Sequence, residues 1–173
     1  MRIQTLTLRG NHYQLLLIVS LLIIIALTHT PAVNAEKITR PVVVYKSPSC
    51  GCCGAWVDHI EQAGYSTNIQ HPKDLNTIKD QLGVSPVYQA CHTAVHKGYV
   101  FEGHIPASVI QHFLASMPDA LGLAVPGMPL GSPGMDTNSD FRAYEVLVLH
   151  KDGSSTPYAR ISSNDIIYLE KRS

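Results

Sequence analysis

Short apolar runs separated by polar turns divide the chain from Glu36 onward into strands and helices. Residues 42–45 (VVVY) form a β-branched run bounded by a proline and a polar turn, which predicts a buried strand. From about Cys50 the apolar positions recur with a helical period, and Gly64 is expected to end this helix. One face of the helix carries Cys53, Trp56, Val57 and Ile60.

The same pattern predicts several further elements. They are a strand at 66–70, a helix at 74–82, a hairpin of 93–96 with 99–102, a helix at 107–117, and a hairpin of 145–149 with 155–161. Asp74 can cap the second helix, and Pro106 is expected at the first position of the third. Residues 118–138 are rich in Gly and Pro and are expected to form a loop. This order predicts an α/β (α+β) fold of three layers, a central mixed sheet flanked by helices with an added C-terminal hairpin.

The first 35 residues have a different pattern, typical of a secretory signal peptide. Arg2 and Arg9 are accompanied by no acid, and an apolar stretch of roughly 13 residues, interrupted only by a serine, follows at 15–27. Residues 33–35 (VNA) fit a cleavage site. We therefore predict a signal peptide at 1–35 and one mature domain at 36–173. The alternative is an uncleaved membrane anchor, although a spanning helix needs about 20 apolar residues.

Charge and compartment exclude some partners. The whole chain has 13 basic and 13 acidic residues, and removal of 1–35 leaves 11 against 13. No basic patch or stripe remains, which argues against nucleic acid as a partner. Export predicts the bacterial periplasm, where disulfides persist, with no membrane attachment after cleavage.

Three of the four cysteines crowd into the sequence Cys50-Gly51-Cys52-Cys53. A bridge between such close cysteines would close almost no loop, so the cluster indicates chemistry rather than a structural staple. Its place after a buried strand, at the first turn of a helix, favours thiolates, because the free N–H groups and the helix dipole stabilise negative charge.

The third cysteine decides between two kinds of chemistry. Cys50 and Cys53 have the CxxC spacing that, between a strand and a helix, resembles the redox motif of thioredoxin-like proteins. Cys52 adds a sulfur that a dithiol enzyme does not need, whereas a soft-metal site uses every thiolate it can get. Soft ligands select Cu(I), zinc or an iron–sulfur cluster, so the cluster favours metal binding.

Beyond the cluster, four further residues of the chain are candidate metal ligands. Cys91 would face the cluster in a thioredoxin-like arrangement, unless it is an inert buried cysteine. Met128 and Met135 lie in a Pro/Gly-rich loop, where thioether sulfur favours Cu(I) over zinc, or else they fill a gap in the core. His104 precedes the third helix and is either a ligand or a polar residue at its N-terminus. His92 follows Cys91 and is expected on the opposite face of an extended strand.

The other histidines of residues 36–173 are expected to be exposed to solvent. They are His59, His71, His96, His112 and His150. They form no HxxxH or HExxH pattern, which counts against a dedicated zinc hydrolase.

Four blocks of the sequence together resemble the CopG-type copper-resistance proteins, periplasmic metal-binding proteins. The blocks are YKSPSCGCC at 45–53, CHTA at 91–94, YVFEGHIP at 99–106 and GLAVPGMPLGSPGM at 122–135. The resemblance implies a thioredoxin-like fold, a CxCC copper site and a role in copper resistance, and it suggests a change between Cu(I) and Cu(II). It implies that the thiolate ligands are Cys50, Cys52, Cys53 and Cys91. His104, Met128 and Met135 match family blocks as further candidates.

Three functions stay open from the sequence. The first is a periplasmic copper-binding protein, in which bridging thiolates hold one or more copper ions and copper-handling proteins are candidate partners. The second is a thiol–disulfide oxidoreductase that uses Cys50 as nucleophile and Cys53 as resolving thiol. The third is a disulfide-stapled interaction domain. Whether the copper protein is also an oxidoreductase acting on copper is left open.

Overall fold

The computed structural model describes residues 40–135 and 141–169. The chain divides into two units between Ile38 and Thr39, and all described residues belong to the second unit. The signal peptide predicted at 1–35 lies outside the described residues and stays a prediction.

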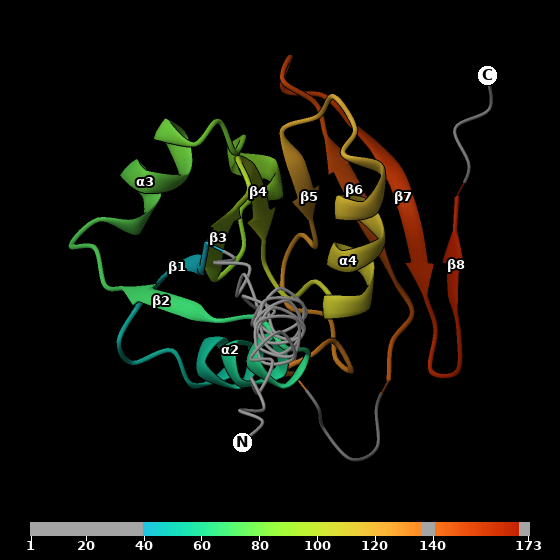
Figure 1. The fold of residues 1–173 in the computed structure, drawn as a ribbon, viewed down its shortest axis with the longest axis horizontal. Coiled ribbons are helices and arrows are strands. Elements are labelled where there is room, and N and C mark those ends of the chain that lie inside the picture. Colours follow the sequence, from blue (N-terminus) through green and yellow to red (C-terminus); the bar gives the residue numbers. More distant parts are fainter. Residues whose placement is uncertain (1–39, 136–140, 170–173) are drawn as a thin grey trace, which may run out of the picture. The chain divides into compact units, whose positions relative to one another are not determined.

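Eight strands form one open mixed sheet (Figure 1). They are β1 (Val42–Lys46), β2 (Thr67–Gln70), β3 (His92–His96), β4 (Tyr99–Glu102), β5 (Gly122–Ala124), β6 (Tyr144–Leu149), β7 (Ser155–Ile161) and β8 (Ile166–Tyr168). Their order across the sheet is β2-β1-β3-β4-β5-β6-β7-β8. The pairs β1–β2 and β4–β5 are parallel, and the other pairs are antiparallel.

Helices cover both faces of this sheet. They are α2 (Gly51–Gln62), α3 (Leu75–Gln81) and α4 (Ala107–Ser116), with a short 3₁₀ turn η1 (Pro86–Tyr88). The buried side chains of α2 and α4 join one core cluster with the strand residues Val44, Ala94 and Phe101. Because neighbouring strand residues point to opposite faces, Thr93 faces the other way, where Lys79 of α3 contacts it. The predicted three-layer α/β fold is confirmed.

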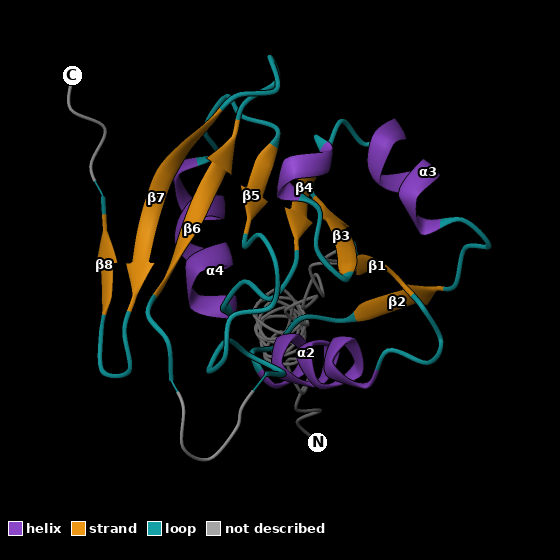
Figure 2. Ribbon diagram, turned by 180° about the vertical axis from the view of Figure 1, so that it is seen from behind, coloured by secondary structure: helices purple, strands orange, loops and turns teal. Residues whose placement is uncertain are grey.

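The two ribbon views agree with this layering. Figure 1 shows α4 in front of β5 and β6, and Figure 2, seen from behind, shows β6 and β7 in front of α4. The added C-terminal hairpin is β6–β7, extended by β8. The term thioredoxin-like for the first four strands and their helices stays a prediction. Within residues 40–135 and 141–169, no helix combines the length and apolar character of a membrane span.

Most of the predicted elements are confirmed, and the differences have physical reasons. The stretch 118–138 was expected to be a loop, but it contains β5, which is only three residues long and therefore shows no period. Gly122 begins β5 beside Val100, whose carbonyl oxygen would lie 1.7 Å from an added Cβ, so the strand pairs here only because glycine has no side chain. Pro106 is the N-cap of α4 rather than its first helical residue. The turn η1 and the edge strand β8 were not predicted.

Candidate metal centre

The junction of β1 and α2 places three cysteines at one end of the sheet. β1 ends at Lys46, and the backbone N–H of Cys50 then donates to the carbonyl of Ser47 (3.2 Å) to close the turn. Cys50 is the N-cap of α2, and its sulfur accepts from the backbone N–H of Cys53 (3.4 Å). A side chain that accepts an N–H in this way satisfies one of the free donors of the first helical turn. A sulfur atom therefore caps the N-terminus of α2.

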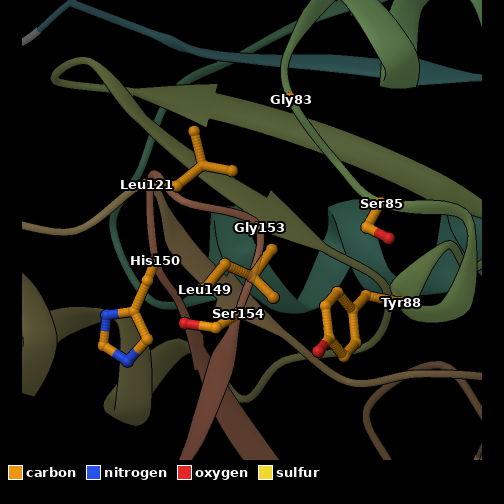
Figure 3. A pocket seen from close by; sticks show the side chains of 8 residues that line it. All are labelled: Gly83, Ser85, Tyr88, Leu121, Leu149, His150, Gly153 and Ser154. Atoms are coloured by element: carbon orange, nitrogen blue, oxygen red, sulfur yellow. The ribbon is translucent and has the colours of Figure 1, made fainter.

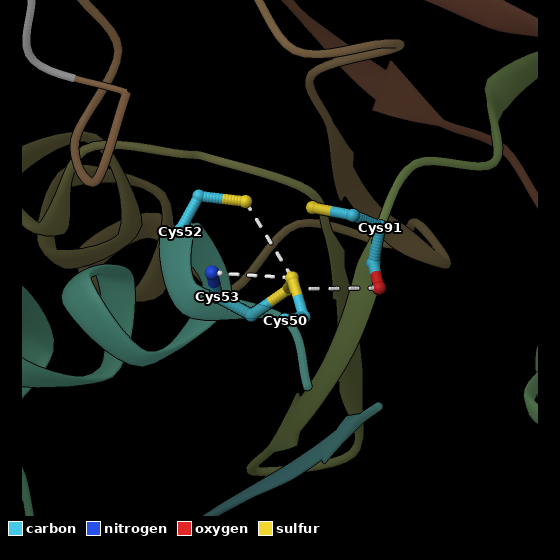
Figure 4. Close-up of side chains that lie close together, drawn as sticks. All are labelled: Cys50, Cys52, Cys53 and Cys91. Carbon is cyan, nitrogen blue, oxygen red and sulfur yellow. Dashed lines mark hydrogen bonds between the residues drawn. A yellow bond between two sulfur atoms is a disulfide. The ribbon is translucent and has the colours of Figure 1, made fainter. Parts of the chain in front are cut away.

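Cys50 and Cys53 are joined by a disulfide, with their Cα atoms 5.4 Å apart (Figure 4). The CxxC spacing brings the N-cap sulfur over the side chain one turn later, so the pair needs no distortion of the helix. Cys52 and Cys91 carry free thiols. The Cys52 sulfur lies 3.5 Å from that of Cys50, and because the Cys50 sulfur has no proton in a disulfide, Cys52 is the donor.

Cys91 reaches the cluster from the bend before β3. Its sulfur points toward that of Cys52 in Figure 4, and its carbonyl oxygen lies 3.8 Å from the Cys53 sulfur. The four sulfurs all lie within 4.8 Å of one another. The prediction that Cys91 faces the first helix is therefore confirmed by its position, while its role as a ligand stays a prediction.

His104 is held against Cys91 in a defined tautomer. Its Nδ1 lies 2.8 Å from the carbonyl oxygen of Pro133, which can only accept, so Nδ1 carries the proton. Nε2 then presents its lone pair to the Cys91 sulfur, 2.8 Å away. Burial lowers the pKa of His104, which favours the neutral ring. A histidine whose other nitrogen donates to a carbonyl is the arrangement common to metal ligands.

The expectation that His92 points away from Cys91 is wrong. His92 is the first residue of β3, but Cys91 lies in a bend outside the strand, so the alternation of side chains does not apply. Nδ1 of His92 is 3.4 Å from the Cys91 sulfur. Cys91, His92 and His104 therefore form a second group of metal-type side chains, again within 4.8 Å.

The environment of Cys91 keeps its thiol protonated. Burial, followed by the charge of Cys52, raises the pKa of Cys91 to about 12. Lowered pKa values were predicted for thiols at the N-terminus of the first helix, and Cys91 lies outside that helix. Its S–H donates to Nε2 of His104, so a soft metal ion would take the place of this proton.

The Pro/Gly-rich loop reaches the cluster through its backbone. Pro133 fixes His104, as described above, and Gly134 lies so close to α2 that an added Cβ would be 2.5 Å from the carbonyl oxygen of Cys52. Met135, next along the chain, is half-buried, and its N–H donates to the carbonyl of Ser132 (2.7 Å). Met128 is 53% exposed. The loop is thus brought to the cluster, and the ligand roles predicted for both methionines stay predictions.

Replacing Gly134 by alanine should displace this loop. Gly134 has φ +83°, and the added Cβ would clash with backbone atoms of Cys52 and Trp56, which cannot rotate away. Gly127→Ala is the matched control, because Gly127 has φ +72° and open space around it. We expect the control to lose only the cost of a left-handed residue, about 1–2 kcal/mol. Gly134→Ala should lose more in urea unfolding and should react faster with iodoacetamide at Cys52. Equal losses in the two variants would contradict the docking of the loop on α2.

A buried polar network behind the site holds the Cys91 bend, and it was not predicted from the sequence. Lys79 of α3 and Glu102 of β4 form an ion pair, with side chains 2% and 0% exposed. Lys79 also donates to the Thr93 hydroxyl (2.8 Å), which donates to Glu102 (2.6 Å). The backbone N–H of Ala90 donates to Glu102 as well (2.6 Å). The carboxylate thereby anchors the residue before Cys91.

Of the histidines expected in solvent, His96 is buried and His59 is half-buried. His96 is buried, because it lies on the central strand β3, and its ring packs edge-on against Tyr65. Nε2 of His59 accepts the backbone N–H of Ala107 (3.0 Å) at the start of α4. Both are structural roles, and neither residue belongs to a group of metal-type side chains among the described residues.

Two hollows on the described part of the surface contain no cysteine. The one shown in Figure 3 is lined by Gly83, Ser85, Tyr88, Leu121, Leu149, His150, Gly153 and Ser154. A larger cavity of about 560 Å³ lies against α4 and β7 and also has no cysteine in its lining. In the part of the chain that the structure describes, the cysteine and histidine side chains that could hold a metal ion together lie at the cysteine cluster.

Comparison with known proteins gives both a family and a fold. The family described as "Protein of unknown function, DUF411" matches residues 88–135. No curated protein matches the sequence. Two solved structures are similar to the chain, "Copper resistance protein copG- Form 1" and "Copper resistance protein copG- Form 2". The first is 36% identical with a TM-score of 0.67, covering 71% of this chain and 98% of that one. The second is 37% identical with the same TM-score, covering 70% and 98%.

Proposed function

Because the chain belongs to the family of the copper resistance protein CopG, we propose that it binds copper through Cys50, Cys52, Cys53 and Cys91. The observation that carries the proposal is the convergence of the four sulfurs within 4.8 Å. Thiolate-rich sites select soft ions such as Cu(I). Membership of the family indicates copper as the bound ion, and the four sulfur atoms provide ligands for it.

We further propose that the reduced site holds more than one Cu(I) ion. Opening the Cys50–Cys53 disulfide yields two more thiols beside those of Cys52 and Cys91. A thiolate can bridge two Cu(I) ions, so four sulfurs within 4.8 Å can hold a small cluster rather than a single ion. His104, which already presents Nε2 to Cys91, is the best-placed additional ligand. Met128 and Met135 are proposed only as ligands that the loop carries near the site.

Copper redox interconversion is the finer part of the proposal, and the disulfide supports it. Two Cu(II) ions would each take one electron from the Cys50 and Cys53 thiols. The S–S bond then forms, two protons leave, and the products are two Cu(I) ions and the oxidised protein. An external dithiol would have to supply two electrons to reopen the bridge. Such a donor, together with copper-handling proteins, defines the class of partners, and the periplasm is the compartment in which this chemistry fits.

Thiol–disulfide exchange on other proteins is the second candidate function. It is favoured by the disulfide itself, since Cys50 and Cys53 already form the CxxC pair that such enzymes use. Cys52 counts against it, because a thiol 3.5 Å from Cys50 would attack the bridge and scramble it. The same sulfur adds a ligand to a copper site. The two functions therefore make opposite predictions for Cys52.

The decisive variant is Cys52→Ser. In an anaerobic Cu(I) titration of reduced protein against a chromophoric chelator, we expect Cys52→Ser to bind fewer copper ions and to bind them at least about ten times more weakly, since serine oxygen is a poor ligand for a soft ion. Insulin reduction by metal-free protein is the counter-assay. Robust turnover that survives Cys52→Ser but not Cys50→Ser, with unchanged copper binding, would favour the oxidoreductase.

A further inference from the structure

We propose that Lys46 compensates the charge of the copper site, and that its buried ammonium group offsets part of the negative charge that thiolates bring to bound Cu(I). Lys46 is the last residue of β1, and it is only 7% exposed. This role rests on the proposed function, because the anion that the ammonium group would stabilise is the copper–thiolate cluster. Lys46 is not a ligand and acts through its charge alone.

The side chain of Lys46 lies on the face of the sheet that packs against α2. Alternate residues of β1 are buried, and Val42 and Val44, which precede Lys46 on this face, belong to the core cluster that includes the buried side chains of α2. Across the sheet Lys46 pairs with His92 of β3, and the side chains of such a pair share one face. Nδ1 of His92 is 3.4 Å from the Cys91 sulfur. Lys46 and Cys91 therefore have a common neighbour.

One backbone carbonyl links the ammonium group of Lys46 to the cysteine cluster. Its Nζ donates to the carbonyl oxygen of Ser47 (2.9 Å), and the backbone N–H of Cys50 donates to the same oxygen (3.2 Å). The two nitrogens therefore lie no more than two hydrogen-bond lengths apart. Since the Cys50 sulfur caps α2, the positive charge of Lys46 is held at the turn from which the cluster begins.

Among the described residues, Lys46 has no acidic partner. It belongs to none of their ion pairs, whereas Lys79, the other buried lysine, is paired with Glu102. A buried charge without a counter-ion is costly. The cost has a reason if the site becomes anionic when it is filled. Copper binding turns cysteines into thiolates, and a cluster with fewer Cu(I) ions than thiolates carries a net negative charge.

Two substitutions of Lys46 separate its charge from its hydrogen bond. Lys46→Gln removes the charge but keeps a donor for the Ser47 carbonyl, and Lys46→Arg keeps the charge. In an anaerobic Cu(I) titration of reduced protein against a chromophoric chelator, we expect Lys46→Gln to bind the first Cu(I) equivalent about tenfold or more weakly, and Lys46→Arg to stay close to wild type. Lys73→Met, which removes an exposed charge, is the control and should change the affinity less than about threefold.

Urea unfolding of the metal-free protein distinguishes this role from a structural one. Without copper the ammonium group has no anion to stabilise, so the unfolding midpoint of Lys46→Gln should be no lower than that of wild type. A lysine that only supports the fold predicts a lower midpoint. Lys46→Met is the second neutral variant, and it takes the place of Lys46→Gln if that variant does not fold. If both neutral variants are unfolded or less stable without copper, the proposed role of Lys46 is overturned.

The copper titrations separate the role of Lys46 from the proposed function. Equal Cu(I) affinity in wild type and a folded neutral variant overturns the role of Lys46, although the protein binds copper as proposed. Weak binding by Lys46→Arg as well as by the neutral variant also overturns it, because the charge is then not what matters. Failure of the wild type to bind Cu(I) overturns the proposed function itself.

Discussion

Lys79→Met is expected to cost about 3–5 kcal/mol of unfolding free energy, the range for removing one partner of a buried ion pair. The variant leaves the Glu102 carboxylate 0% exposed without its cation. Its two remaining partners, the Thr93 hydroxyl and the Ala90 N–H, cannot neutralise a charge. Urea unfolding monitored by Trp56 fluorescence measures the loss, since this residue is the chain's single tryptophan and lies in the core.

An exposed ion pair of the same type provides the control. Lys151 and Asp119 also form an ion pair, but their side chains are 67% and 88% exposed. Lys151→Met should therefore change the unfolding free energy by no more than about 1 kcal/mol. The double variant Lys79→Met with Glu102→Leu should recover much of the loss, because no charge stays buried. Similar losses for Lys79→Met and Lys151→Met would show that the buried network does not hold the fold.

The cysteine cluster could be predicted because its geometry is local. Cys50, Cys52 and Cys53 lie within one turn of a helix, so spacing alone brings their sulfurs together. The buried face of α2 was equally readable from the period of its apolar residues, and Asp74 caps α3 as expected, accepting the N–H of Thr77. Cys91 was placed correctly only with an assumed fold, because its contact with the cluster joins residues 38 positions apart.

The features that were missed depend on long-range contacts. Lys79 and Glu102 are polar residues of a helix and a strand, and nothing in the local sequence distinguishes a buried pair from two solvated side chains. Their burial follows from the packing of α3 on the sheet. The error over His92 has a similar origin, since the side-chain direction of Cys91 depends on whether β3 begins at residue 91 or 92. A shift of the strand boundary by one residue therefore changes whether the imidazole of His92 is expected in the site.

Cys91→Ser is expected to have the largest effect on metal binding, because Cys91 is the one side chain common to both ligand groups. The hydroxyl is nearly isosteric with the thiol but is a poor ligand for a soft ion. We expect Cu(I) affinity of the reduced protein to fall by at least about 100-fold, beyond the usual cost of losing an outer-shell partner.

The pH dependence distinguishes loss of this ligand from general damage. The pKa of Cys91 is raised to about 12, so the thiol is protonated at any lower pH and must release its proton when copper binds. Falling pH therefore weakens binding, and this one group contributes a factor of about ten per pH unit. Cys91→Ser should lower the slope of log affinity against pH by about one. A variant that merely misfolds would lose affinity without this change in slope. A wild-type slope shared by Cys91→Ser would show that Cys91 does not ligate copper.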